Sequence, residues 1–275
     1  MSQSSRVMAG VVQMTSTENV DANMRSVHEL VGEAASRGAR VVVVPECFAY
    51  LGPEEGKISI AESLDEGGPI LDRCRAAAVH ADVDVVYGGF WEKGEDPKKV
   101  RNACIYMRAD GSISAVYRKI HLFDVDLPDG TKLLESETVE PGSDQLVVAD
   151  APFGSLGLSV CYDLRFPELY RRLVDAGAIA LAIPAAFTLT TGKDHWHVLL
   201  RARAIEQQCY VLAAAQTGHH YGRRWSYGHA LIVDPWGTVV AECGEGQGVA
   251  VAPVDPAYVT QVRRALPSLQ HRRFR

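Results

Sequence analysis

Short apolar runs alternate with longer amphipathic stretches along most of this chain. Runs rich in β-branched residues predict strands, because such side chains pack well on a buried, pleated surface. Residues 40–45 form the clearest run, with four consecutive valines, and predict a strand that is buried on both faces. Similar runs predict strands at residues 7–14, 83–91, 103–108, 112–117, 156–160, 179–184, 210–216, 229–233, 239–241 and 249–254.

Helical spacing of apolar residues fills the intervals between these strands. It predicts helices at residues 19–37, 70–80, 167–176, 193–208 and 256–266. Gly38 is a suitable stop for the first helix, and Pro167 is suited to the first turn of the third. Residues 120–143 are rich in Asp, Pro, Gly and Glu and predict a surface loop. Strands and helices alternate in both halves without a low-complexity linker, so we expect an α/β fold with a single domain over residues 1–275.

Composition narrows the class of protein. The chain has 275 residues, of which 47% are hydrophobic, and this is enough for one large core. A net charge of −6 with no dominant basic stripe argues against a nucleic-acid partner, and we read the Arg-rich stretch 271–275 as a solvated end. No apolar stretch has the form of a signal peptide or reaches the roughly 18 to 20 residues needed to span a bilayer. The six cysteines are scattered without a CxxC pair, which suits a reducing cytoplasm.

Three potentially reactive side chains each follow a predicted buried strand. They are Glu46, Lys119 and Cys161. Parallel strands that end together bring their carboxyl ends to one rim, where ligand sites of layered α/β folds lie. A carboxylate, an ammonium and a thiol at one rim supply the base, the oxyanion partner and the nucleophile of a covalent hydrolase.

Each of these residues also has a plainer interpretation. Cys161 lies between a strand and a helix that starts with proline, where backbone N–H groups favour a thiolate, but most cysteines are simply buried. Glu46 must be paired or titrate abnormally if it is buried, and otherwise it faces solvent. Position alone does not distinguish Lys119 from Arg118 and His121.

Metal and nucleotide sites lack a matching pattern. His195 and His197 are two residues apart on a predicted helix and therefore point in different directions, unlike the i, i+4 pair of a zinc helix. Gly88 and Gly89 do not complete a phosphate-binding loop. We therefore expect no metal and no cofactor.

The three strand ends, in this order, resemble the nitrilase superfamily of carbon-nitrogen hydrolases. The motifs are residues 44–48, 117–121 and 159–168, and the resemblance extends over roughly residues 6–273. It implies a four-layer αββα sandwich and selects Lys119 as the oxyanion partner. It also implies that Glu135 holds Lys119, with Glu137 as the alternative, and that the backbone N–H of Tyr162 contributes to the oxyanion hole.

Within the superfamily the chain resembles the amidase branch that contains deaminated glutathione amidase and omega-amidase. The resemblance implies hydrolysis of a terminal amide of a small acidic substrate to a carboxylate and ammonia through a cysteine thioester. Deaminated glutathione is the first expected substrate and α-ketoglutaramate the alternative. The substrate would be bound by four residues of this branch's stretches, Arg165, Phe187, Thr188 and His195.

Two other functions stay open from the sequence. One is nitrilase chemistry on a C≡N group, and the other is a non-catalytic binding or assembly member of the superfamily. The resemblance further implies a homo-oligomer, either a dimer or a larger assembly. Apart from other copies of the chain, the expected partner is the small-molecule amide substrate.

Overall fold

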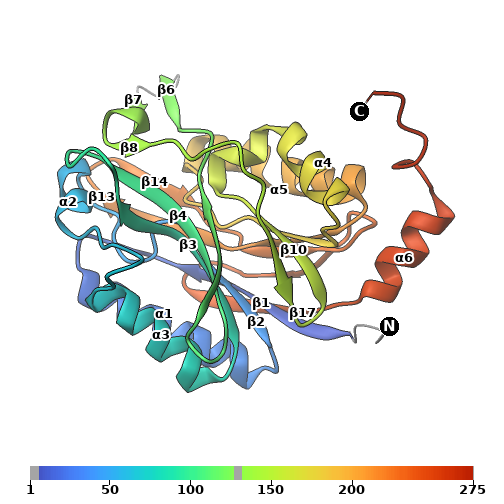
Figure 1. Cartoon of the computed structure of the whole chain (residues 1–275), viewed down its shortest axis with the longest axis horizontal. Coiled ribbons are helices and arrows are strands. Elements are labelled where there is room, and N and C mark those ends of the chain that lie inside the picture. Colours follow the sequence, from blue (N-terminus) through green and yellow to red (C-terminus); the bar gives the residue numbers. More distant parts are fainter. Residues whose placement is uncertain (1–5, 127–131, 275) are drawn as a thin grey trace.

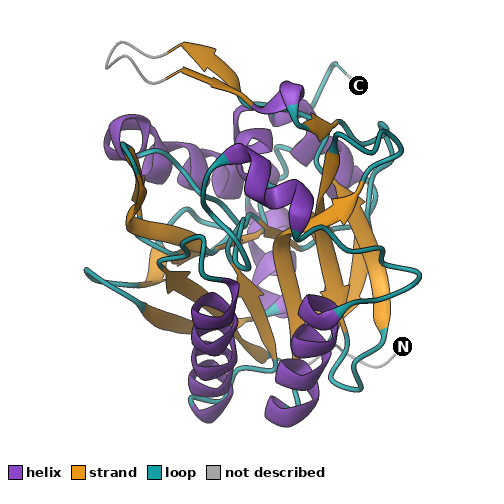
Figure 2. Cartoon of the chain, turned by 90° about the vertical axis from the view of Figure 1, so that its left-hand side faces the viewer, coloured by secondary structure: helices purple, strands orange, loops and turns teal. Residues whose placement is uncertain are grey.

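The computed structural model of the chain describes residues 6–126 and 132–274. Two β-sheets pack face to face, and helices cover the outer side of each sheet (Figures 1 and 2). This arrangement confirms the expected α/β fold with layers in the order αββα.

The first sheet is built around the valine run. Its strands follow the order β14-β13-β1-β2-β3-β4-β5, with β17 beside β1 and β8 beside β4. The bounds are β1 (Val7–Met14), β2 (Val41–Val44), β3 (Asp84–Lys93), β4 (Val100–Met107), β5 (Ile113–Arg118), β8 (Val139–Glu140), β13 (Ala215–Tyr221), β14 (Arg224–Tyr227) and β17 (Gly248–Val254). Strand β2 lies between β1 and β3 and is parallel to both.

Alternation along β2 explains how one sheet serves two cores. Val41 and Val43 belong to the core between the sheets, whereas Val42 and Val44 pack under the helices. All four valines are fully buried, which confirms the prediction from their run. The helices on this side are α1 (Val20–Ser36) and α3 (Pro69–Ala81), which lie next to each other in Figure 1.

The second sheet has the order β16-β15-β12-β11-β10-β9. Its strands are β9 (Val148–Ala151), β10 (Gly154–Leu158), β11 (Ala180–Ala182), β12 (Tyr210–Ala213), β15 (Leu231–Val233) and β16 (Val239–Glu242). Helices α4 (Pro167–Asp175) and α5 (Leu189–Gln207) cover its outer face through buried side chains such as Tyr170 and Trp196. Helix α2 (Glu54–Ser59) is short, and α6 (Pro256–Ala265) follows β17 near the C-terminus (Figure 1).

Two predicted segments differ from the structure. The run 210–216 is two strands, because β12 belongs to the second sheet and β13 to the first, with Ala214 between them. The sequence does not reveal this passage from one sheet to the other, because residues 210–216 are buried in both sheets. The expected loop 120–143 contains β6 (Asp124–Asp126), β7 (Lys132–Leu134), a 3₁₀ turn (Glu135–Glu137) and β8, while residues 127–131 lie outside the described part.

Candidate active site

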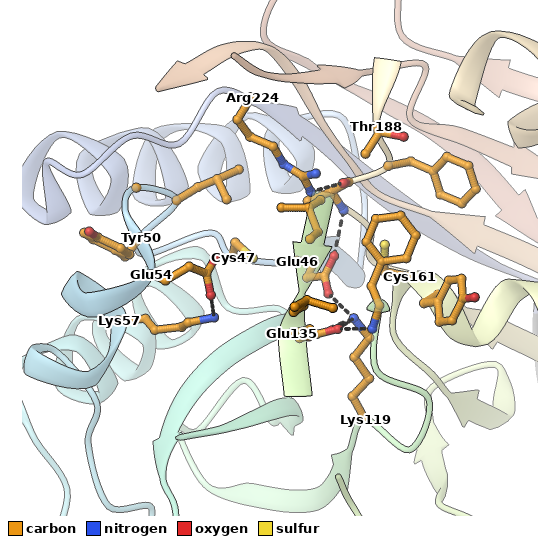
Figure 3. A pocket seen from close by; sticks show the side chains of 18 of the residues that line it. Glu46, Cys47, Tyr50, Glu54, Lys57, Lys119, Glu135, Cys161, Thr188 and Arg224 are labelled. Carbon is orange, nitrogen blue, oxygen red and sulfur yellow. Dashed lines mark hydrogen bonds and ion pairs between the residues drawn. The ribbon is translucent and has the colours of Figure 1, made fainter. Parts of the chain in front are cut away.

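The three predicted side chains meet in one cavity, beyond the ends of strands from both sheets. Glu46 follows β2, Lys119 follows β5 and Cys161 follows β10 by a few residues. All three line a cavity of about 340 Å³, together with Glu135 from the 3₁₀ turn (Figure 3). The size is that of a small-molecule site. The strand ends therefore bring a carboxylate, an ammonium and a thiol together as expected.

Lys119 forms the centre of a buried ion network. Its Nζ lies 3.0 Å from Oε1 of Glu46, and 3.0 and 2.8 Å from the two carboxylate oxygens of Glu135. The side chains of Lys119 and Glu46 are only 2% and 5% exposed. Burial of an unpaired charge carries a large desolvation free energy, and the ion pairs offset that cost. This geometry distinguishes Lys119 from Arg118, which pairs with Glu92.

Further hydrogen bonds fix both carboxylates. The amide of Asn102 donates to Glu46 at 3.0 Å, and the backbone N–H of Ala186 donates to its second oxygen at 2.9 Å. The backbone N–H of Phe123 donates to Glu135 at 2.6 Å. Sequence reasoning missed Asn102, which lies within β4, and Ala186, which acts through its backbone N–H and therefore has no side-chain signal. No hydrogen bond joins Glu137 to Lys119 among the described residues, so Glu135 is the glutamate that holds it.

Cys161 sits at a strained turn. It begins a 3₁₀ turn (Cys161–Arg165) with φ of 46°, a left-handed conformation that residues other than glycine rarely adopt. Its N–H donates to the carbonyl of Pro184 at 2.9 Å, which fixes the backbone. The thiol hydrogen-bonds to the carboxylate of Glu46, so the nucleophile and base candidates are in direct contact.

Asp163 holds this turn in place. It is fully buried and accepts hydrogen bonds from the Val160 N–H at 2.8 Å, the Tyr117 hydroxyl at 2.7 Å and a ring nitrogen of His121 at 2.7 Å. His121 is thereby assigned to the turn and not to the cavity. The only sequence signal for Asp163 was an acidic side chain three residues after Val160, the spacing of a helix cap.

Glycines let the neighbouring strand approach this site. Gly89 has φ of 66°, and a Cβ atom there would lie 2.5 Å from the backbone nitrogen of Cys47. At Gly88 a Cβ would lie 2.1 Å from Cβ of Pro184. Only glycine permits such contacts. The Gly88–Gly89 pair therefore supports the segment that carries Glu46.

Electrostatics set the resting protonation states. Burial by itself would raise the pKa of Glu46, but the charge of Lys119 and hydrogen bonds from Cys161, Lys119 and Ala186 lower it below its usual value. Burial would lower the pKa of Lys119, yet Glu135 and Glu46 raise it well above its usual value. Both groups are therefore charged at neutral pH.

The thiol behaves differently. Burial and the negative charge of Glu46 raise the pKa of Cys161 well above its usual value. A backbone N–H, that of Ala186, does favour the thiolate by lowering this pKa, but burial and Glu46 outweigh it in the resting site. Cys161 is a neutral thiol that donates to an ionised carboxylate, which is the starting state for general-base activation.

Other predicted residues divide between the cavity and the surface. Tyr162, Arg165, Phe187 and Thr188 line the cavity. His195 does not line it; this exposed residue lies 3.3 Å from Nη1 of Arg165 and reaches the site only through that contact. Residues that line the cavity and that sequence reasoning did not select include Cys47, Tyr50, Lys57, Trp91 and Tyr221.

A separate cluster of His197, His229 and Glu242 has ligand atoms within 4.8 Å of one another, away from the cavity. Each imidazole hydrogen-bonds to Oε1 of Glu242 at 2.8 Å. His197 and His195 thus have different partners, as their spacing predicts, and those of His197 come from the loop between β14 and β15 and from the end of β16.

Comparisons with known proteins agree with this geometry. The profile of the carbon-nitrogen hydrolase family matches residues 8–264. A protein from Synechocystis named deaminated glutathione amidase is 46% identical over 269 residues, which cover 97% of this chain and 98% of that protein.

Solved structures are similar over nearly the whole chain. The NitFhit protein of C. elegans superposes with a TM-score of 0.92 at 40% identity, covering 98% of this chain and 66% of that one. Nit3 of Saccharomyces cerevisiae, a member of the nitrilase superfamily, superposes with a TM-score of 0.85 at 30% identity and covers 98% of this chain and 97% of Nit3.

Proposed function

Because this chain belongs to the carbon-nitrogen hydrolase family, we propose that Cys161 hydrolyses an amide of a small acidic substrate through a thioester. The chain is a hydrolase of carbon–nitrogen bonds other than peptide bonds. The observation that carries the cysteine assignment is the contact between the neutral thiol of Cys161 and the ionised carboxylate of Glu46, inside a cavity that Lys119 also lines.

In the first half of the reaction, Glu46 accepts the thiol proton as sulfur attacks the amide carbon. Negative charge then develops on the carbonyl oxygen. Lys119 and the backbone N–H of Tyr162 stabilise this charge, and Glu135 keeps Lys119 in position. When the C–N bond breaks, Glu46 returns its proton to the leaving nitrogen, and the acyl group stays on Cys161.

In the second half, water replaces the leaving group. Glu46 takes a proton from this water as its oxygen attacks the thioester, and the same oxyanion groups stabilise the new intermediate. The C–S bond breaks, the proton returns to sulfur, and a carboxylic acid leaves. The burial of Glu46 and Lys119 strengthens each of these electrostatic contacts.

Deaminated glutathione is the proposed substrate, since the curated relative from Synechocystis bears that name over almost the same length. The leaving group depends on the amide. A primary amide such as α-ketoglutaramate releases ammonia, whereas the 2-oxoglutaryl amide of deaminated glutathione is secondary and releases cysteinylglycine in place of the ammonia expected from the sequence. An assay must therefore detect amines as well as ammonia.

The test is a parallel turnover assay with deaminated glutathione, α-ketoglutaramate and a nitrile of the same acyl chain. We expect the highest kcat/KM for deaminated glutathione, and a loss of at least about a thousandfold in Cys161→Ala. Cys47→Ala is the matched control, because Cys47 is a buried thiol that lines the same cavity.

Other outcomes would redirect the proposal. Preference for α-ketoglutaramate would indicate an omega-amidase, and preference for the nitrile would indicate a nitrilase. Turnover that survives in Cys161→Ala would contradict the mechanism, and no turnover of any compound would favour a binding or assembly role.

A single domain over residues 1–275, a homo-oligomer and a cytoplasmic location remain proposals from the sequence. In the described part of the chain, no helix is both long and apolar enough to cross a membrane.

A further inference from the structure

Arg224 brings a guanidinium to the cavity without a carboxylate partner. It belongs to β14, lines the cavity and donates from Nη2 to the carbonyl of Ala186 at 3.0 Å. Its Nη1 is buried and has no hydrogen-bond partner within residues 6–126 and 132–274. A buried donor without a partner is energetically costly, so Nη1 is suited to donate to an oxygen of a ligand.

Three other cations of the cavity are already engaged, and a fourth, Lys132 on β7, is an exposed residue. Lys119 contacts Glu46 and Glu135, and Lys57 pairs with Glu54 and lies over the ring of Trp91. Arg165 lies over the rings of Tyr162 and Phe187 and contacts His195. Among the described residues, no carboxylate forms an ion pair with Arg224. Its charge is therefore available to a ligand.

The backbone of Ala186 links Arg224 to the reacting groups. The Ala186 carbonyl accepts from Arg224, and the Ala186 N–H donates to Glu46. Ala186 is thus the single residue between the guanidinium of Arg224 and the carboxylate of Glu46. In Figure 3, Glu46 lies between Arg224 and Lys119. The guanidinium of Arg224 is directed toward Glu46.

We propose that Arg224 binds a carboxylate of the substrate and thereby selects acidic amides over neutral ones. A guanidinium presents parallel N–H donors that match two carboxylate oxygens, and the unpaired Nη1 supplies one such donor. This inference rests on the proposed function, and it names the group that recognises the acidic part of the substrate.

A deaminated glutathione carries two carboxylates, one on its 2-oxo acid end and one on its glycine end. Two analogues separate them. In the first, a methyl group replaces the carboxylate of the 2-oxo acid, which gives the 4-oxopentanoyl amide of cysteinylglycine. In the second, an N-ethyl amide replaces the glycine. The carboxylate that Arg224 contacts is the one whose removal makes the substrate insensitive to Arg224.

The experiment compares kcat/KM of the wild-type protein and Arg224→Gln on the full substrate and both analogues. We expect Arg224→Gln to lower kcat/KM for the full substrate by about 10- to 100-fold, mainly through KM. For one analogue the two proteins should be equal within about a factor of two. Arg224→Lys should recover part of the loss, because lysine keeps the positive charge but lacks the parallel N–H donors of a guanidinium.

Arg223→Gln is the matched control, since Arg223 is the exposed neighbour that does not line the cavity. An equal loss on all three compounds would overturn the proposal and assign Arg224 to holding Ala186. No loss on the full substrate would overturn it as well. Failure of the proposed function is distinguishable, because the wild-type protein itself would then turn over none of the three.

Discussion

At the residue scale, the site depends on charges that are buried only because they are paired. Glu46, Lys119 and Glu135 form one network, and each oxygen of the two carboxylates accepts at least one hydrogen bond. Removal of one member would leave the others uncompensated, which is more costly than loss of a surface ion pair. The network therefore fixes both the positions and the protonation states of the reacting groups.

The glutamate beside Lys119 offers a residue-scale prediction. Glu135→Gln removes the charge that most strongly raises the pKa of Lys119, so this pKa falls. Lys119 must be protonated to stabilise the oxyanion, and activity should therefore decline at a lower pH on the alkaline side. We also expect kcat/KM at neutral pH to fall by about 10- to 100-fold. A pH–rate profile measures both effects.

Glu137→Gln is the control for this prediction. Glu137 lies on the same 3₁₀ turn and also lines the cavity, but it makes no hydrogen bond to Lys119 in the described residues. Equal profiles for the two variants would show that Glu135 does not act through Lys119.

At the element scale, functional residues follow the ends of strands, and supporting contacts join strands that are distant in sequence. His220 on β13 makes two supporting contacts of this kind. Its Nδ1 lies 2.7 Å from the carbonyl of Ser16, after β1, and its Nε2 lies 2.8 Å from the hydroxyl of Ser226 on β14. The neutral imidazole satisfies both partners by donating from Nδ1 and accepting at Nε2.

This contact predicts a pH dependence of stability. Burial lowers the pKa of His220 from 6.5 to about 4, so the unfolded chain binds the proton more tightly than the folded protein. The free energy of unfolding should therefore fall as the pH drops from about 6.5 to about 4, and His220 accounts for about 3 kcal/mol of this loss. Above pH 6.5 this contribution is constant.

The measurement is chemical denaturation of the wild-type protein and His220→Gln at several pH values. The variant is expected to be less stable at pH 7, and the difference should narrow as the pH falls to 4. The exposed neighbour provides the control, His219→Gln, which should follow the wild-type protein. A gap between wild type and His220→Gln that is independent of pH would contradict the prediction.

At the scale of the whole molecule, the sequence predicted those strands, helices and strand-end residues that depend on local pattern alone. The valines of β2, the strand ends at Glu46, Lys119 and Cys161, and the long helices follow from apolar periodicity and turn residues. Contacts between layers were not predictable in this way. Ala186, which follows β11 of the second sheet, donates to Glu46 and accepts from Arg224, and both of these residues come from the first sheet. The contact between Asn102 on β4 and Glu46 lies within the first sheet, but it joins residues far apart in sequence.

The passage of the chain between sheets was also hidden from the sequence. Strands β12 and β13 are adjacent in sequence and uniformly buried at their junction, so no change in polarity marks Ala214. The short strands β6 and β7 pair with each other, but their polar composition resembles a loop. Pairing partners, not local composition, decide these elements.

The central claim is that Cys161 carries the acyl group of the substrate during turnover. The most direct test is to quench the reaction with deaminated glutathione in acid and to map the modified peptide by mass spectrometry. We predict an added mass equal to the acyl group on the peptide that contains Cys161, and the same adduct in Cys47→Ala. Turnover without an adduct, or an adduct confined to Cys47, would contradict the account.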